Sequence, residues 1–148
     1  MDTSRSQTGV LEQERNASYT FLSQVLREKI DQACVVSFDN RAQVLQGMTS
    51  SRQDLAAALS QLRIPGIVAT LLYEAVRQSA ESLMRKEQGR KAFILLTDGV
   101  SFRDKTSIST AIEFAQRADT IIYAIRLKVR LSRCRPAMDT THRFKIRY

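Results

Sequence analysis

Histidine and cysteine are scarce in this sequence. It contains one histidine, His142, and two cysteines, Cys34 and Cys134, among 148 residues. A single histidine does not build a zinc site, and two cysteines set no disulfide framework. Cys34 lies in an apolar stretch and is expected to be a small core residue, and we expect no disulfide between it and Cys134.

Long apolar runs are also lacking. None approaches the roughly 20 residues needed to cross a bilayer, so we expect no transmembrane segment. The first residues are polar and show no signal peptide; the sequence as it stands predicts a cytoplasmic protein, or an exported one if a leader lies upstream. With 43% hydrophobic and 26% charged residues, the composition favours one soluble globular domain with a real core.

Catalytic motifs are absent as well. The sequence has no Gly-x-Ser-x-Gly elbow and no Walker-type phosphate loop, and its one histidine lies near the C-terminus, away from the patterned segments. A serine hydrolase needs a nucleophile and a base close together, and a phosphoryl-transfer enzyme needs a phosphate cradle. We therefore expect that the protein is not an enzyme.

Positive charge is concentrated at the C-terminal end. After Leu127, seven basic residues accompany a single acidic residue, Asp139, and they supply most of the formal net charge of +8. This basic tail, 128–148, is either a solvated segment or a surface for polyanions; nucleic acid is a less favoured partner because no recognised nucleic-acid module accompanies it. The candidate polyanion-binding residues are Lys128, Arg130, Arg133, Arg135, Arg143, Lys145 and Arg147.

Helical and strand patterns alternate along the rest of the chain. Apolar residues at three- and four-residue spacing predict helices, and short β-branched runs predict strands. This succession indicates an α/β, Rossmann-like fold, a mostly parallel sheet flanked by helices, with an early hairpin adding an antiparallel edge strand. The expected elements are a helix at about 10–30, a hairpin at 33–38 and 42–48, a short helix started by the capping residue Ser51 and stopped by Pro65-Gly66, a helix at about 70–86, a strand at 92–96, a helix at 107–117 and a strand at 120–127.

The strand at 92–96 is followed by Thr97, Asp98 and Gly99. It reads as a strand buried on both faces, and in open α/β sheets ligands bind beyond the carboxyl ends of such strands. Asp98 is therefore expected at a binding site. Its expected partner is the N-terminal segment Asp2-Thr3-Ser4-Arg5-Ser6, which offers one carboxylate and two hydroxyls at alternate positions.

Three segments together resemble the metal-ion-dependent adhesion site (MIDAS) of von Willebrand factor type A (VWA) domains. They are Asp2-x-Ser4-x-Ser6, the threonine in Ala69-Thr70-Leu71, and Thr97-Asp98-Gly99, in the order and at the intervals typical of the family. The resemblance covers residues 1–127. Within the family, the sequence is similar to the bacterial VWA-related proteins. It implies a VWA-like domain whose function is metal-dependent protein binding, as in adhesion or complex assembly.

Hydroxyl and carboxylate oxygens are hard ligands, which match Mg²⁺ or Mn²⁺ better than zinc or copper. The resemblance implies that Ser4, Ser6 and Thr70 coordinate the ion directly or through water, while Asp2 and Asp98 supply charge partly through bridging water. It also implies that the ion accepts an Asp or Glu carboxylate from a partner protein. Read singly, each residue has an ordinary alternative, such as a helix N-cap at Thr70 or a turn at Asp98-Gly99. A scaffold that binds no metal therefore stays open.

The sequence also departs from the family pattern. Arg5 stands where glycine is common, and Ile67-Val68-Ala69 replaces a glycine-rich approach to the threonine. In the family, a central hydrophobic strand precedes the first segment, whereas only Met1 precedes Asp2 here. We therefore expect the central first strand to be missing, and the VWA-like domain at 1–127 to be incomplete. The sequence after Leu127 also lacks the pattern of the family's final strand and helix.

Overall fold

The computed structural model describes residues 1–66 and 69–126. The predicted polyanion-binding residues of the basic tail lie outside these ranges, as does Cys134. The elements are the 3-10 helices η1 (Arg5–Gly9) and η2 (Met84–Lys86), the helices α1 (Leu11–Val25), α2 (Arg52–Ser60), α3 (Leu72–Ser82) and α4 (Ile108–Arg117), and the strands β1 (Ala33–Phe38), β2 (Ala42–Thr49), β3 (Lys91–Thr97) and β4 (Thr120–Arg126). The predicted α/β fold is confirmed.

The four strands form two separate half-sheets within the described residues. Strands β1 and β2 make an antiparallel hairpin, joined by a short turn at Asp39–Arg41, as the sequence predicts. Strands β3 and β4 pair in parallel without a register shift, from Lys91 beside Thr120 to Thr97 beside Arg126. The helix α4 connects them, so this half of the molecule is a βαβ unit.

The first three residues join the two half-sheets. The Asp2 amide donates to the Leu96 carbonyl of β3 (3.0 Å), while the Thr3 amide donates to the Phe38 carbonyl of β1 (2.9 Å). Asp2 forms a parallel bridge with Phe38. Because Met1–Thr3 bonds on both sides, β1 and β3 lie one strand apart at this end rather than next to each other.

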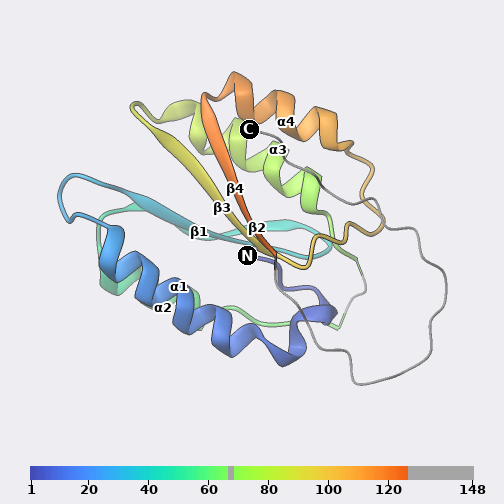
Figure 1. Ribbon diagram of the computed structural model, residues 1–148, viewed down its shortest axis with the longest axis horizontal. Helices are drawn as coiled ribbons and strands as arrows, with labels where there is room; N and C mark the ends of the chain where they lie inside the picture. The colour runs from blue at the N-terminus through green and yellow to red at the C-terminus, as the bar shows by residue number, and fades with distance from the viewer. Residues whose placement is uncertain (67–68, 127–148) are drawn as a thin grey trace.

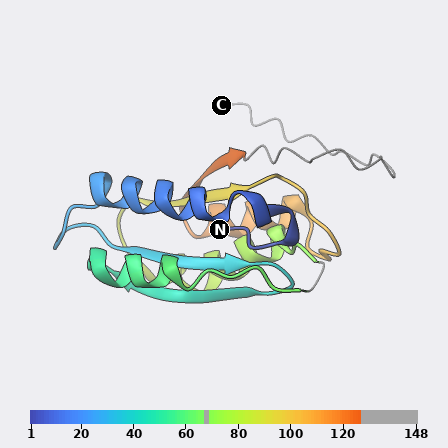
Figure 2. The ribbon, with the colours of Figure 1, turned by 90° about the horizontal axis from the view of Figure 1, so that it is seen from below.

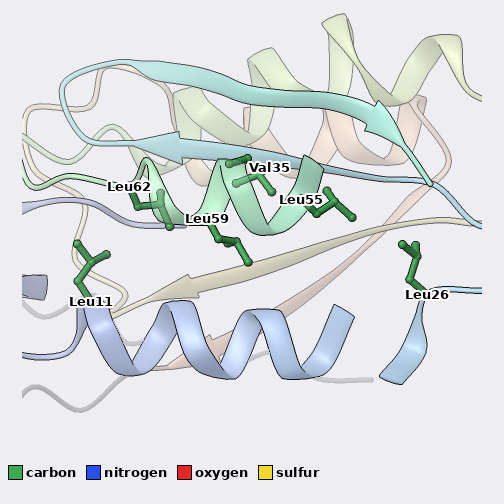
Figure 3. Close-up of a cluster of buried hydrophobic side chains, with 7 residues drawn as sticks. Leu11, Leu26, Val35, Leu55, Leu59 and Leu62 are labelled. Carbon is green, nitrogen blue, oxygen red and sulfur yellow. The ribbon is translucent and has the colours of Figure 1, made fainter. Parts of the chain in front are cut away.

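Helices cover the strands on two sides (Figure 1): α1 and α2 lie on one side, and α3 and α4 on the other. The core on the first side is shown in Figure 3, where leucines of α1 and α2 meet around Val35. The second core lies between α3, α4 and β3, and includes Val76, Ala80, Phe93 and Ala115. None of the described helices has the length and hydropathy needed to span a membrane.

Helix α1 is shorter than predicted. It ends at Val25, and the chain then turns through Lys29, whose φ of 71° is left-handed and cannot continue a helix. The predicted buried face is also partly wrong, because Phe21 and Val25 are 42% and 56% exposed. Ile30, which the prediction placed in the helix, is 70% exposed beyond it. The packing of α1 against α2 instead buries Leu11, with Leu22 partly covered.

The other elements follow the sequence prediction more closely. Ser51 caps α2 as expected, its side-chain oxygen accepting a hydrogen bond from the Asp54 amide (3.2 Å). Strand β3 lies where it was predicted, but burial on both of its faces is wrong. Phe93 is buried against α3 and α4, whereas Ile94 on the opposite face is 38% exposed.

Candidate metal centre

Asp2 lies at the point where the two half-sheets meet and is fully buried. Each of its carboxylate oxygens accepts a hydrogen bond. Oδ1 accepts a hydrogen bond from the backbone amide of Ser4 (2.9 Å). Oδ2 accepts one from the hydroxyl of Thr97, the last residue of β3 (2.7 Å). The first and third predicted segments are therefore in direct contact, and Asp2 fixes the path of the chain into Ser4.

Ser4 and Ser6 stand at the start of η1 with their hydroxyl oxygens 2.9 Å apart. Ser4 is buried and Ser6 is exposed, so the pair forms an edge between the interior and solvent. The side-chain amide of Gln7 donates to the Ser6 hydroxyl at 3.4 Å. Arg5, which lies between the two serines, is exposed. The alternate spacing thus brings two hydroxyls to one place, as the sequence predicts.

Asp98 follows β3 directly, at the carboxyl end of the parallel pair. Its Oδ1 accepts a hydrogen bond from the Val100 amide (2.9 Å), and the Thr97 hydroxyl accepts one from the Gly99 amide (3.1 Å). Gly99 has a φ of 83°, a left-handed conformation that glycine adopts at little cost. These bonds make a compact turn that holds Asp98 half-buried beside the Asp2 segment.

Thr70 is buried, and its backbone pairs with Phe102 in an isolated antiparallel bridge. The second segment is thereby tied to the loop that follows Asp98. It is also tied to the turn between β1 and β2, because the Leu71 amide donates to the Asp39 carbonyl (2.7 Å). Thr70 stands two residues before α3 begins, and the N-cap position of α3 is Leu71, so the alternative reading of Thr70 as the N-cap is wrong.

The cap of α3 comes from a residue that the sequence analysis did not single out. The carboxylate of Asp104 accepts hydrogen bonds from the amides of Tyr73 (2.7 Å) and Glu74 (3.2 Å), which are the free amides of the first turn. The hydroxyl of Ser101 donates to the same oxygen (3.2 Å). Asp104 lies 31 and 30 residues along the chain from these two amides, so local sequence patterns give no signal for it.

Three ionisable groups, those of Met1, Asp2 and Glu14, are poorly hydrated because they are buried. Burial raises the pKa of Asp2, and the negative charge of Asp98 adds to the increase, although the hydrogen bonds from Ser4 and Thr97 oppose it. Burial also raises the pKa of Glu14 on α1 to about 7, with the charge of Asp2 contributing. The Met1 ammonium has its pKa lowered to about 6, again mainly by burial. An added cation would offset the repulsion between these carboxylates.

The donors fit a hard divalent ion. No group of three His, Cys, Asp or Glu side chains suited to a metal occurs in 1–66 and 69–126. Ser4 and Ser6 already present two hydroxyl oxygens side by side, with the Asp2 carboxylate fixed behind them. Both carboxylate oxygens of Asp2 already accept hydrogen bonds from protein donors, so Asp2 is suited to contact a cation through a bridging water molecule. Metal binding by Asp2, Ser4, Ser6, Thr70 and Asp98 stays a prediction.

Comparison with known proteins agrees with the fold described above. Several solved structures share the fold, although at identities too low to show more than the fold. Proximal thread matrix protein 1 from the mussel byssus aligns at 21% identity over 83% of this chain and 33% of that chain, with a TM-score of 0.73. Another structure of that protein has a zinc-occupied MIDAS motif. BatB from Bacteroides thetaiotaomicron aligns at 18% identity over 84% of this chain and 62% of that chain, with a TM-score of 0.68.

The VWA domain of SpRpn10 aligns at 12% identity over 88% of this chain and 87% of that chain, with a TM-score of 0.55. The present chain thus spans about a third of the mussel protein's length and about three fifths of BatB. A search of curated proteins found no match. The model of the von Willebrand factor type A domain matches residues 1–135, most of the sequence. The chain therefore belongs to the von Willebrand factor type A domain family.

Proposed function

We propose that this domain binds a protein ligand through a divalent cation, Mg²⁺ or Mn²⁺, held where the two half-sheets meet. Ser4, Ser6 and Thr70 supply hydroxyl ligands, and Asp2 and Asp98 supply negative charge and orient the site. The observation that carries the proposal is the position of Asp2. Its two oxygens bind the Ser4 amide and the Thr97 hydroxyl, which places the serine pair at the carboxyl edge of β3.

The ligand chemistry follows from the shortage of direct anionic ligands. When bound, the cation supplies a positive centre with a position open to an oxygen donor from outside the domain. A carboxylate is the strongest such donor on a protein surface, so the partner contributes an Asp or Glu side chain. In this proposal the residues of the chain bind and orient the ion, and none of them forms or breaks a covalent bond. The proposal is therefore a binding function, not catalysis.

Calorimetric titration of the full chain with Mg²⁺, Mn²⁺ and Zn²⁺ tests the site. Zinc is included because a relative holds it in its MIDAS motif. We expect millimolar or tighter binding of Mg²⁺ or Mn²⁺. Ser6→Ala and Asp98→Asn should abolish it without unfolding the chain, because Ser6 is exposed and Asp98 is half-buried.

Two matched controls separate the site from general effects of charge and polarity. Ser23→Ala removes a half-buried hydroxyl on α1, which donates a hydrogen bond to the Thr20 carbonyl of the same helix (2.7 Å). Asp139→Asn removes a carboxylate in the tail. Both variants should bind metal as the unmodified chain does. Absence of Mg²⁺ and Mn²⁺ binding in a folded chain would leave a VWA scaffold without the metal function.

A further inference from the structure

The loop that follows β3 exposes two apolar side chains next to the candidate metal centre. Val100 is 57% exposed and Phe102 is 46% exposed. Val100 stands two residues after Asp98, and Phe102 pairs with Thr70 in the isolated bridge. In Figures 1 and 2, this loop, drawn in gold, lies at the same end of the molecule as η1, which follows Ser4. We call Val100 and Phe102 the apolar pad.

Hydrogen bonds to two candidate ligands fix the backbone of the apolar pad. The Val100 amide donates to the Asp98 carboxylate (2.9 Å), and Phe102 and Thr70 exchange two backbone hydrogen bonds of 3.0 Å. The hydroxyl of Ser101, which lies between the two apolar residues, is 3.2 Å from the Thr70 carbonyl oxygen. Ser101 therefore turns inward, and its neighbours turn outward, because side chains alternate along a segment that pairs as a strand does. The pad thus keeps one position relative to Asp98 and Thr70.

The apolar pad does not contribute to the packing of the domain. Neither of its side chains belongs to the apolar cores of the described residues. A single exposed apolar residue is ordinary on a protein surface, whereas neighbouring ones at the rim of a site indicate contact with a partner. An apolar side chain of a bound partner would remove the surface of the pad from water, which stabilises the complex.

The surroundings of the apolar pad are basic. The Arg103 guanidinium lies over the Phe102 ring, 5.3 Å from its centroid, and both Arg103 and Lys105 are exposed. The Asp104 carboxylate between them accepts hydrogen bonds from the first turn of α3. The charge presented to a partner beside the pad is therefore positive, which favours an acidic segment over a basic one.

Building on the proposed metal-dependent function, we propose that the partner carries a bulky apolar side chain two residues from its metal-binding Asp or Glu, and that this side chain packs on the apolar pad. In an extended segment, side chains two residues apart face the same side, about 6.6 Å from each other. Asp98 and Val100 are also two residues apart and span at most about 7 Å. Acidic residues occur on every protein surface, so the pad supplies a selectivity that the cation alone lacks.

Fluorescein-labelled peptides of about seven residues test this selectivity. Each is made of Gly and Ser around a central Glu, with Leu placed two positions before or after it. Matched peptides carry Ser in place of Leu, Gln in place of Glu, or Leu directly beside Glu. Fluorescence anisotropy with the full chain in saturating Mn²⁺ measures their affinities. The better of the two Leu peptides should bind at least about tenfold more tightly than the Ser peptide. Leu beside Glu should bind like Ser, and the Gln peptide should not bind.

Variants of the pad assign the contact to its two side chains. Phe102→Ala should weaken binding of the better Leu peptide about tenfold, and Val100→Thr about threefold, while the Ser peptide is unaffected. The matched controls are Phe21→Ala and Val25→Thr, which make the same changes at side chains 42% and 56% exposed. These residues lie toward the end of α1 that is remote from η1 (Figure 2), and the controls should change affinity less than about twofold. Calorimetry should give the same Mn²⁺ affinity in all four variants.

The outcomes separate this proposal from the proposed function. Equal affinity of the Leu and Ser peptides, with the preference for Glu over Gln intact, would overturn the role of the pad alone. Equal affinity of the Glu and Gln peptides would overturn the metal-dependent function, and this proposal with it. Equal binding of Leu beside Glu would overturn the two-residue spacing.

Two other results would give the pad a different role. If Phe102→Ala weakened the Leu and Ser peptides equally, Phe102 would shape the site without contacting the apolar residue, contrary to the proposal. Light scattering that shows a dimer, lost in Phe102→Ala and unaffected by the Leu peptide, would assign the pad to a second copy of the chain and overturn the partner segment.

Discussion

Glu14 is a buried carboxylate with no hydrogen-bond partner for its side chain among residues 1–66 and 69–126. It stands on α1 within electrostatic range of Asp2, Asp98 and the Met1 ammonium. An unpartnered carboxylate in such a place is costly when ionised, and it holds its proton more tightly than it would in the unfolded chain. Sequence pattern alone does not predict this burial, because Glu14 falls among the polar residues of an amphipathic pattern.

The first prediction concerns this carboxylate. Its pKa rises from an ordinary value of 4.5 to about 7 in the folded state, so the folded chain binds more protons than the unfolded chain between these pH values. The contribution of Glu14 to the free energy of unfolding should therefore be fully present below pH 4.5 and be lost as the pH rises to 7, by about 2 to 3 kcal/mol. The Met1 amine acts in the opposite sense, adding stability as the pH rises from 6 to 8.

Urea denaturation in the presence of EDTA at a series of pH values measures how the free energy of unfolding depends on pH. Glu14→Gln should make the fall between pH 4.5 and 7 smaller, leaving the part that comes from the raised pKa of Asp2, and should leave the rise above pH 6. Glu12→Gln, an exposed neighbour paired with Arg15, is the control and should leave the profile unchanged. A Glu14→Gln profile that matches the unmodified chain would show that Glu14 is not the titrating group.

At the scale of elements, the loop from Asp98 to Ser107 holds the second and third segments of the candidate site together. Phe102 pairs with Thr70, and Asp104 caps the first turn of α3. Thr106 also donates a hydrogen bond to Glu74 of α3. The loop therefore fixes where Thr70 stands relative to Asp98, although neither Phe102 nor Asp104 is a candidate ligand.

The second prediction follows from the cap. Asp104→Ala leaves the amides of Tyr73 and Glu74 without their acceptor and should lower the free energy of unfolding by about 1 to 2 kcal/mol. It should also weaken Mg²⁺ binding, because it loosens the loop that positions Asp98. Ser51→Ala removes the cap of α2, away from the site, and should cost about 1 kcal/mol without changing metal affinity. Equal metal affinity in both variants would show that the loop does not position the site.

Elements with local causes were predictable from the sequence. The hairpin follows from a turn between two β-rich runs, and α2 from its capping serine. The extent and face of α1 were not predictable, because they depend on contacts with α2 and with the N-terminal residues. The site divides in the same way. Asp98 at a strand end and the Ser4–Ser6 pair could be predicted from local pattern, whereas the roles of Asp104 and Thr97 depend on partners distant in the sequence.

At the scale of the whole molecule, two half-sheets meet at Met1–Thr3, and the candidate metal centre lies at the same junction. Asp2 bonds to β3 through its backbone and through Thr97, while Thr3 bonds to β1. The sequence analysis predicted that the strand leading into Asp2 would be missing. Within the described residues, the backbone of Met1–Thr3 bonds to both β1 and β3 and keeps the two strands one strand apart at this end.

The central claim is that a cation at this junction offers an open position to a partner carboxylate. Proton relaxation of water around bound Mn²⁺ tests it directly, because Mn²⁺ with exchangeable water enhances relaxation and a ligand that displaces this water lowers the enhancement. The full chain with Mn²⁺ should show enhancement that a Glu-containing peptide reduces and the matching Gln-containing peptide does not. Asp98→Asn should show no enhancement beyond free Mn²⁺. Enhancement that persists in Asp98→Asn, or that both peptides leave unchanged, would contradict the claim.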